Sequence, residues 1–302
     1  MSDAITIAVV PQGSTHQYWK HMETGAAKAA RDLQGAGVTV DLIWKAPIRE
    51  GDHEEHKQIV ESFVRKGVHG IVLSPFDSQF LIRTVEEAAR KNVPTVVIDS
   101  ELDTPRIVSF VGTDNVKAGA IAADRMAELL HGHGKVYVQR YQKGSASTDA
   151  RETGFIERVR STHPNLEIER SAEYAGGTRD SAKRAAEASL GKHIDSFQGV
   201  FTPNESSTTG MLMALQGLSH TNKLMFVGFD HSDTLTTALE VGQIQGLVVQ
   251  NPFLMGELGV KAVVDHLEGR TVSKRMDTGA ILVTSDNLHS RAIQALLHPT
   301  SV

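Results

Sequence analysis

Short apolar runs that end on polar residues, each followed by a helical pattern, constrain this chain more than any other feature. The run at residues 5–10 ends at Pro11-Gln12-Gly13, and the run at 70–73 ends at Ser74-Pro75. Five further runs end in the same way, at residues 94–98, 107–111, 200–202, 225–228 and 246–249. Short β runs that alternate with helices of about 10–15 residues indicate βαβ units and a parallel sheet covered on both faces. In such a sheet the polar ends lie at the carboxyl edge of the strands, where small ligands bind.

Strand and helix patterns alternate along the whole chain. Apolar residues at helical spacing from Tyr18 to Leu33 predict the first helix, Gly67 predicts the C-cap of the second, and a third ends before Pro94. Other strands are predicted near 38–44, 135–139, 166–170, 198–202, 223–228, 244–249 and 279–283, and other helices near 115–131, 149–161, 179–190, 206–218, 232–241 and 252–268.

The number of these units predicts two lobes. The 302 residues are enough for two ordinary domains. About ten βαβ units are too many for one doubly wound sheet and match a barrel of eight poorly. We therefore predict an α/β protein with two doubly wound parallel-sheet lobes, the first of which ends near the strand at Phe110.

The composition bounds the function. A formal net charge of −5 gives no sequence-wide attraction to nucleic acid backbones or anionic lipid. No apolar stretch approaches the roughly 20 residues of a membrane span. The chain has no cysteine, which removes disulfides, thiolate chemistry and iron–sulfur clusters. The first residues lack the basic and apolar regions of a signal peptide, so we expect either a cytoplasmic protein or the mature form of an exported one.

The order of short motifs resembles a known family, the type I periplasmic sugar-binding proteins of ABC importers, typified by ribose receptors. The resemblance covers nearly the whole chain. The matching pieces are Tyr18-Trp19, Ser74-Pro75, Ile98-Asp99, Thr113-Asp114-Asn115 with Gly119, Arg151 before Gly154-Phe155, Pro203-Asn204-Glu205, Val227-Gly228-Phe229-Asp230 and Gln250 before Pro252.

The resemblance implies a fold with a hinge. Members of that family have two lobes joined by three crossings, with the ligand in the cleft between the lobes. The crossings would lie near Thr113, Gln250 and Ala280. Lobe one would then hold residues 1–112 plus 251–279, and lobe two residues 113–250 plus 280–302.

The resemblance also implies a function without catalysis. It predicts a monomeric extracytoplasmic protein that captures a small neutral sugar or polyol, closes by a hinge motion and delivers it to the membrane subunits of an ABC permease. A membrane chemoreceptor is an open further partner. No cofactor, metal or nucleic acid partner is expected, and a periplasmic location with the signal peptide removed follows from the family.

Charged residues at strand ends are the first candidates for ligand contact. Asp99 and Asp230 each follow a β run directly, and a carboxylate can accept from two adjacent sugar hydroxyls. The alternative is that either one caps the following helix or turn. Arg151 occupies the family's arginine position, where its planar fork can donate to two ligand oxygens. The alternative for Arg151 is a surface arginine.

Amides and aromatic residues complete the predicted set. Asn204 and Gln250 can donate and accept, although Asn204 could instead cap a helix and Gln250 could be a satisfied hinge amide. Tyr18 lies on the apolar stripe and Phe229 beside an aspartate, so each could pack in a core or contact the ligand. Trp19 lies about 100° from that stripe, which favours stacking on a ligand at the cleft rim. The remaining predicted contacts are Gln12, Thr113 and Gln142.

The chain departs from the ribose pattern, so the identity of the sugar stays open. Ribose receptors have arginine where this chain has Ser100, and asparagine and a phenylalanine pair where it has His16 and Tyr18-Trp19. The segment 147–150 and Pro203 weakly resemble the receptor for a furanosyl autoinducer, but that receptor has a lysine at the place of Gln12. The ligand-sensing core of a LacI-like regulator is a further alternative, although the N-terminal helix-turn-helix that such repressors need is not seen. An enzyme is disfavoured because no nucleophile, metal set or cofactor motif accompanies the carboxylates.

Two further motifs carry no functional prediction. His53-Glu54-Glu55-His56 fits neither HExxH nor a zinc-finger spacing and is interpreted as a solvated helix start. The segment 131–135 contains glycines and a lysine but precedes a strand, so it is interpreted as a turn and not a phosphate loop.

Overall fold

The computed structural model describes residues 4–48, 51–191 and 193–299, and the chain forms two compact units. The first unit, lobe 1, consists of residues 1–113, 251–278 and 298–302, and the second, lobe 2, of residues 114–250 and 279–297. The chain therefore passes between lobes near the three expected positions, and once more after Leu297. We expected the last residues in lobe two. His298 instead lies close to His21 of lobe 1. The pKa of the His21 imidazole is lowered mainly by burial, and the nearby His298 lowers it further. The outer bounds at residues 1 and 302 lie outside the described residues.

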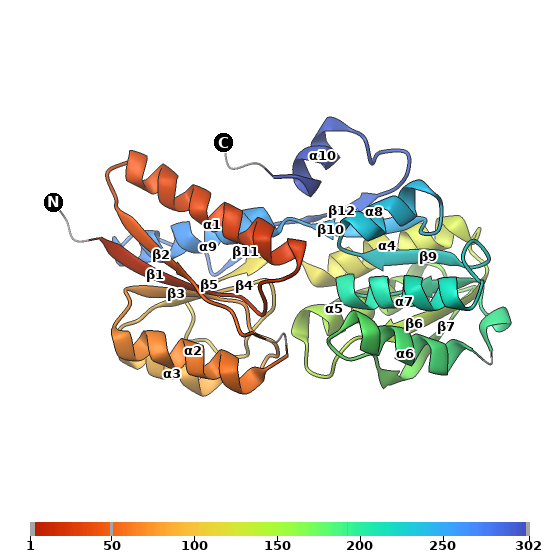
Figure 1. Ribbon diagram of the computed structural model, residues 1–302, viewed down its shortest axis with the longest axis horizontal. Helices are drawn as coiled ribbons and strands as arrows, with labels where there is room; N and C mark the ends of the chain where they lie inside the picture. The colour runs from red at the N-terminus through yellow and green to blue at the C-terminus, as the bar shows by residue number, and fades with distance from the viewer. Residues whose placement is uncertain (1–3, 49–50, 192, 300–302) are drawn as a thin grey trace. The chain divides into compact units, whose positions relative to one another are not determined.

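Lobe 1 is a six-stranded parallel sheet between two pairs of helices (Figure 1). Its strand order is β11-β5-β4-β3-β1-β2, and every neighbouring pair is parallel. Helices α1 and α9 cover one face, and α2 and α3 cover the other. The elements are β1 (Ile5–Val10), α1 (Gln17–Gly35), β2 (Val40–Trp44), α2 (His53–Lys66), β3 (Gly70–Leu73), α3 (Ile82–Arg90), β4 (Thr95–Ile98), β5 (Ser109–Gly112), α9 (Pro252–Leu267) and β11 (Arg275–Asp277).

Lobe 2 repeats this plan with a strand order of β12-β10-β9-β8-β6-β7, in which only β12 is antiparallel to its neighbour. Helices α4 and α5 cover one face, and α6, α7 and α8 cover the other (Figure 1). The elements are α4 (Asn115–Leu129), β6 (Gly134–Arg140), α5 (Ala146–Thr162), β7 (Leu166–Tyr174), α6 (Arg179–Leu190), the 3₁₀ turn Ile194–Ser196, β8 (Gly199–Phe201), α7 (Glu205–Gly217), β9 (Met225–Phe229), α8 (Asp233–Glu240), β10 (Gly246–Gln250), β12 (Ala280–Val283) and α10 (Arg291–Leu297).

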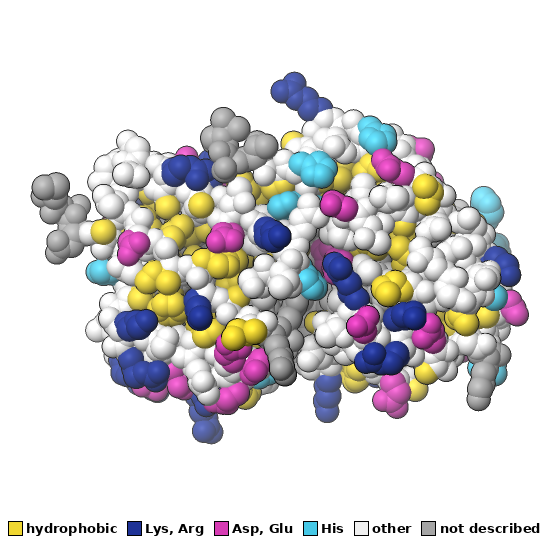
Figure 2. Space-filling model, viewed as in Figure 1, with side chains coloured by type: hydrophobic (Ala, Val, Ile, Leu, Met, Phe, Trp, Pro, Cys, Tyr) yellow, Lys and Arg dark blue, Asp and Glu magenta, His cyan; other side chains and the backbone are white. Residues whose placement is uncertain are grey.

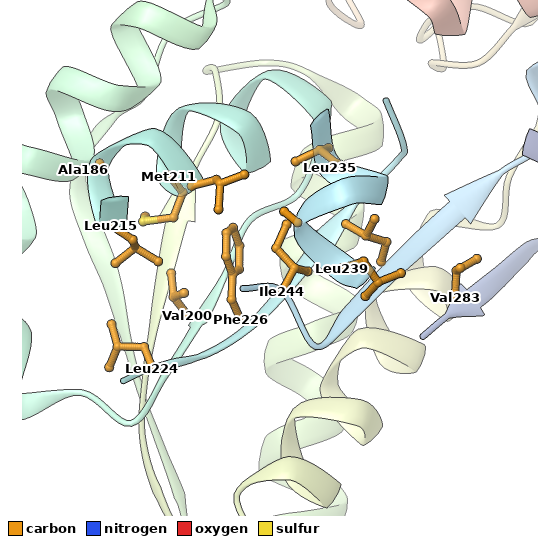
Figure 3. Close-up of a cluster of buried hydrophobic side chains, with 14 of the residues drawn as sticks. Ala186, Val200, Met211, Leu215, Leu224, Phe226, Leu235, Leu239, Ile244 and Val283 are labelled. Atoms are coloured by element: carbon orange, nitrogen blue, oxygen red, sulfur yellow. The ribbon is translucent and has the colours of Figure 1, made fainter. Parts of the chain in front are cut away.

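Each lobe has a hydrophobic core on both faces of its sheet. In lobe 2, Phe226 of β9 is fully buried and lies between residues of α7 and α8, as Figure 3 shows for Met211, Leu235 and Leu239. Burying a side chain of this size contributes about 1.5–3 kcal/mol. The apolar runs that indicated the strands are therefore the same residues that hold the helices onto the sheets.

The expected architecture of two doubly wound lobes is confirmed, except that β12 is antiparallel in the sheet of lobe 2, which was predicted to be parallel. Within the described residues the structure adds three elements that the sequence patterns did not predict: β11, whose three residues include two charged ones, the 3₁₀ turn Ile194–Ser196, and α10, a short helix after the last strand. A polar three-residue strand has no apolar run that could indicate it. The predicted C-cap at Gly67 is confirmed by its left-handed conformation, with φ of 70°.

Close helix pairs fix the positions of the helices that begin at the carboxyl edge. A Cβ at Gly119 of α4 would lie 2.1 Å from the carbonyl oxygen of Arg151 on α5. A Cβ at Gly256 of α9 would lie 2.0 Å from the carbonyl oxygen of Met22 on α1. Real Cβ contacts do not come so close, so both positions need glycine. In each lobe one of these glycines packs against a backbone carbonyl of the paired helix. Met22 of lobe 1 and Arg151 of lobe 2 supply those carbonyls and therefore occupy equivalent positions. None of the helices in the described residues combines the length and apolar character needed to cross a membrane.

Candidate sugar-binding site

Two aspartates end equivalent strands of the two lobes. Asp99 follows β4 and Asp230 follows β9, with φ angles of 67° and 64° in the left-handed region. Their backbone N–H groups donate to the carbonyl oxygens of Val111 and Val248 on the neighbouring strands, at 3.0 and 2.8 Å. Aspartate tolerates this conformation better than most residues because its short side chain can form local hydrogen bonds. Both side chains are thereby placed at the carboxyl edge of their sheet, only 7% and 6% exposed.

The lobe 1 cluster consists of Gln12, Tyr18, Ser74 and Asp99. The hydroxyl of Tyr18 donates to Asp99 Oδ1 at 2.6 Å, and Ser74 Oγ donates to Asp99 Oδ2 at 2.8 Å. Gln12 Nε2 also donates to Asp99 Oδ2 at 3.2 Å, and to the carbonyl oxygen of Pro75 at 2.8 Å. Three polar side chains thus fix the orientation of one carboxylate. The structure brings together three residues predicted from the sequence and adds Ser74.

Trp19 is not where the helical spacing placed it. Its side chain is 4% exposed and packs edge-on against Tyr18, with ring centroids 5.0 Å apart. It belongs to the core cluster that contains Met22 and Ala26, so its placement off the core face is wrong. The reason is that α1 packs against both the sheet and α9, which buries a wider arc than a single apolar stripe. Its Nε1 is buried without a hydrogen-bond partner among the described residues, and ligand contact by Trp19 stays a prediction.

The lobe 2 cluster is built around Arg151, which is 2% exposed near the start of α5. Its Nε donates to Asn115 Oδ1 at 2.8 Å, and its Nη1 donates to the carbonyl oxygen of Pro203 at 2.9 Å. The guanidinium carbon lies 4.2 Å from the ring centre of Phe229. Phe229 was expected either to pack in a core or to contact the ligand, and the structure shows core packing. Its ring is fully buried, and the Arg151 guanidinium stacks on one face of it.

Asp230 faces this guanidinium at the outer limit of ion-pair distance. The nearest atoms, Arg151 Nη1 and Asp230 Oδ2, are 4.0 Å apart. Gln250 Nε2 donates to Asp230 Oδ1 at 2.7 Å, and the backbone N–H of Glu205 donates to Oδ2 at 3.3 Å. Gln250 Oε1 is buried and accepts no hydrogen bond within the described part of the chain. The amide nitrogen of Gln250 has a hydrogen-bond partner and its amide oxygen has none. The alternative prediction, a hinge amide with all its hydrogen bonds made within the protein, is therefore wrong.

The other predicted contacts differ in their surroundings. Asn204 caps α7, because its Oδ1 accepts from the N–H of Ser207 at 3.3 Å, which is the alternative that the sequence left open. Thr113 is buried at the last residue before the first crossing. Gln142 is half-buried after β6, at the place that Gln12 holds after β1. Ligand contact by these residues stays a prediction.

A buried carboxyl lies directly beside Arg151. Glu152 is 1% exposed, and its Oε2 accepts from Arg170 Nη2 at 2.9 Å. Burial raises the pKa of Glu152 above its ordinary value, and the ion pair with Arg170 only partly opposes this.

The structure also describes the two motifs that carried no functional prediction, residues 53–56 and 131–135. His56 is 1% exposed and packs against Phe76, so the interpretation as a solvated helix start is wrong for this residue. Burial lowers the pKa of His56 to about 4. In the described residues no group of three His, Cys, Asp or Glu side chains could hold a metal ion. Residues 130–132 form a turn, as predicted for this segment, but Gly134 and Lys135 already belong to β6, so the turn is shorter than the predicted 131–135.

Two residues of the clusters were missed as site candidates. Ser74 and Asn115 both stand in motifs that carried the family resemblance, so the available signal was their position at a strand end or helix start. Neither is charged or aromatic, and their partners Asp99 and Arg151 lie 25 and 36 residues away.

Comparison with known proteins decides the family. A family model described as a periplasmic binding protein domain matches residues 7–271. The chain belongs to this family. The assignment made from the order of the motifs is therefore confirmed.

Several family members are similar over almost their whole length. A carbohydrate transporter solute-binding protein from Agrobacterium radiobacter, solved in complex with D-arabinose, is 32% identical, with a TM-score of 0.90 over 99% of this chain and 100% of that one. The D-allose-binding periplasmic protein of Escherichia coli is 28% identical over 87% of this chain and 84% of its own length. The ribose import binding protein of Bacillus subtilis is 28% identical over 92% of this chain and 87% of its own length.

Proposed function

We propose that this periplasmic binding protein captures a neutral monosaccharide or polyol outside the cytoplasm and delivers it to the membrane subunits of an ABC importer. It acts by binding and not by catalysis. The observation that carries the proposal is that each lobe presents a buried, oriented carboxylate at the carboxyl edge of its sheet.

The chemistry of the two clusters fits sugar hydroxyls. A hydroxyl donates one hydrogen bond and accepts others. Asp99 and Asp230 supply acceptors, and Gln250 Oε1 is a buried acceptor that a ligand hydroxyl would satisfy. Arg151 supplies a donor, since its Nη2 makes no hydrogen bond among the described residues. We propose Gln12, Tyr18, Asp99, Arg151, Asp230 and Gln250 as ligand contacts, with Thr113, Gln142 and Asn204 beside them.

The charges of the clusters favour a neutral ligand. Each cluster contains an aspartate, Asp99 in lobe 1 and Asp230 in lobe 2, so an anionic group of a sugar acid or sugar phosphate would meet electrostatic repulsion from either carboxylate, whereas a neutral sugar would not. On the face shown in Figure 2, basic and acidic side chains are interspersed over the surface. The sugars named for the relatives, D-arabinose, D-allose and ribose, are neutral monosaccharides and support the same class.

The test is a ligand screen of the purified chain by thermal shift, followed by calorimetry. The panel holds pentoses, hexoses, deoxy sugars and polyols, with a uronic acid and a sugar phosphate as charged counterparts. A cognate sugar at about a hundred times its Kd adds roughly 2.7 kcal/mol to the stability, which raises the Tm measurably. Asp230→Ala should abolish that rise. No response to any neutral sugar, or turnover of a bound one, would overturn the proposal.

A further inference from the structure

We propose that a second copy of this chain docks on the free edge of β2, by antiparallel pairing of β2 with its own counterpart. The family resemblance predicts a monomer, and this pairing joins two such monomers when the concentration is raised. The inference is independent of sugar binding, because it concerns the edge strand of lobe 1 and none of the residues proposed to contact the ligand.

The outer side of β2 offers backbone groups for pairing. β2 is the last strand of the lobe 1 sheet, beyond β1 (Figure 1). The N–H of Lys45 donates to the carbonyl oxygen of Val9 on β1. Because backbone groups alternate in direction along a parallel pair, the N–H and C=O groups of Val40, Leu42 and Trp44 point away from β1. Within the described residues these outward groups have no hydrogen-bond partner.

β2 lacks the features that usually keep an edge strand from pairing with another chain. Natural edge strands are short, charged or bulged. β11, at the other edge of the same sheet, has three residues, of which two are charged. β7, an edge strand of lobe 2, carries several charged residues and a register shift against β6. In β2 four of the five residues are apolar, and all four are only half-buried.

The sequence of β2 complements itself when the strand meets a second copy in antiparallel orientation. In a two-fold pair centred on Ile43, Asp41 lies opposite Lys45 of the second copy, and the same pair recurs on the other side of the axis. Both side chains are exposed, and neither has an ion-pair partner in the part of the chain that the structure describes. Centres at Asp41 or Lys45 place like charges opposite each other, and centres at Leu42 or Trp44 place a charge opposite Ile43. Charge complementarity therefore selects one register.

The same register pairs the apolar side chains and the outward backbone groups. Val40, Leu42 and Trp44 share the face of the sheet that α1 and α9 cover, and Leu42 lies opposite Trp44 of the second copy. Ile43 lies on the other face, opposite Ile43 of the second copy. Leu42 and Trp44 are also the residues whose backbone groups point outward, so they form the hydrogen-bonded pairs of the new ladder. Backbone, apolar contacts and charges thus agree on one alignment.

The experiment is sedimentation velocity of the full chain without sugar, over a series of protein concentrations. The wild type should dimerise with a Kd on the order of 10–100 µM, as a small and transient interface does. Asp41→Lys and Lys45→Asp each place like charges opposite each other and should weaken the dimer at least about tenfold. Mixed in equal amounts, the two variants should dimerise with each other, because each then meets the opposite charge.

Two matched controls separate this edge from other surfaces. Asp195→Lys makes the same change of charge at a lobe 2 side chain that is 93% exposed. Ile281→Lys alters β12, the other apolar edge strand, at a residue that is 48% exposed. Both should dimerise like the wild type, and a loss as large as that of Asp41→Lys in either one overturns the inference.

The remaining outcomes are equally decisive. A wild type that stays monomeric at about 1 mM, single variants that dimerise unchanged, or a mixture of them that stays monomeric overturns the inference and leaves the proposed function intact. The double variant Asp41→Lys/Lys45→Asp restores both ion pairs and should dimerise like the wild type. It takes the place of the mixture if a single variant fails to fold.

Discussion

The two lobes share one plan and differ in how they hold their aspartate. The sheets have matching strand orders, and Asp99 and Asp230 end equivalent strands in the same left-handed conformation. Lobe 1 fixes Asp99 with neutral side-chain donors, whereas lobe 2 places Asp230 opposite a guanidinium. At the place of Arg151, lobe 1 has the fully buried Met22. The fold therefore supplies the position of the carboxylate, while a few side chains around it determine its electrostatics.

The largest expected effect comes from making lobe 2 resemble lobe 1 at this position. Arg151→Met removes the cation facing Asp230 and should lower sugar affinity by about 100-fold or more, since hydrogen bonds to charged groups are strong and Asp230 stays buried. Calorimetry with the cognate sugar measures this. Arg158→Met on the same helix, whose side chain is 41% exposed, is the matched control and should bind normally. Equal affinities of the two variants would contradict a role for Arg151 in the site.

The second expected effect concerns stability in acid and belongs to lobe 1. His56 has a pKa of about 4 in the folded protein, against 6.5 ordinarily, because it is buried. As the pH falls, this imidazole therefore takes up a proton in the unfolded chain before it does so in the folded protein. The free energy of unfolding decreases between pH 6.5 and pH 4 as a result, by about 3 kcal/mol at most. Urea unfolding at several pH values should show this slope, and His56→Gln should flatten it.

The matching control for this slope lies in lobe 2. His289→Gln replaces a histidine whose side chain is 73% exposed and should leave the slope as it is. An unchanged slope in His56→Gln would assign the acid sensitivity to other groups.

A smaller effect is expected from loosening the lobe 1 cluster. Tyr18→Phe removes the 2.6 Å hydrogen bond to Asp99 and keeps the ring against Trp19. Because Ser74 and Gln12 still hold the carboxylate, affinity should fall only about 3- to 10-fold. Calorimetry on Tyr18→Phe and Arg151→Met side by side measures the two losses of affinity. It tests whether the neutral donors around Asp99 contribute less to binding than the guanidinium that faces Asp230. A loss as large as that of Arg151→Met would reverse this ranking.

The smallest effect concerns the buried carboxyl beside the lobe 2 cluster. The folded-state pKa of Glu152 is raised, so the folded protein loses stability as the pH rises above the carboxyl's ordinary pKa. Glu152→Gln keeps an acceptor for Arg170 and should raise the Tm at pH 7 by about 1–3 °C. The gain should vanish in acid, where the wild-type carboxyl is protonated. A lower Tm at pH 7 would mean that the ion pair with Arg170 outweighs the burial.

The sequence alone determined the alternation of elements, the two-lobed α/β architecture, the family and the strand-end positions of Asp99 and Asp230. It did so because strand and helix periodicity and the polar ends of strands are local signals that can be read within a few residues. Tertiary structure alone decided that Trp19 is buried, that Phe229 lies under Arg151, and that Ser74 and Asn115 orient the two charged clusters. Tyr18 and Asp99 are 81 residues apart in the chain and 2.6 Å apart between their oxygens. Such contacts depend on which elements pack side by side, and periodicity within one element carries no information about its neighbours.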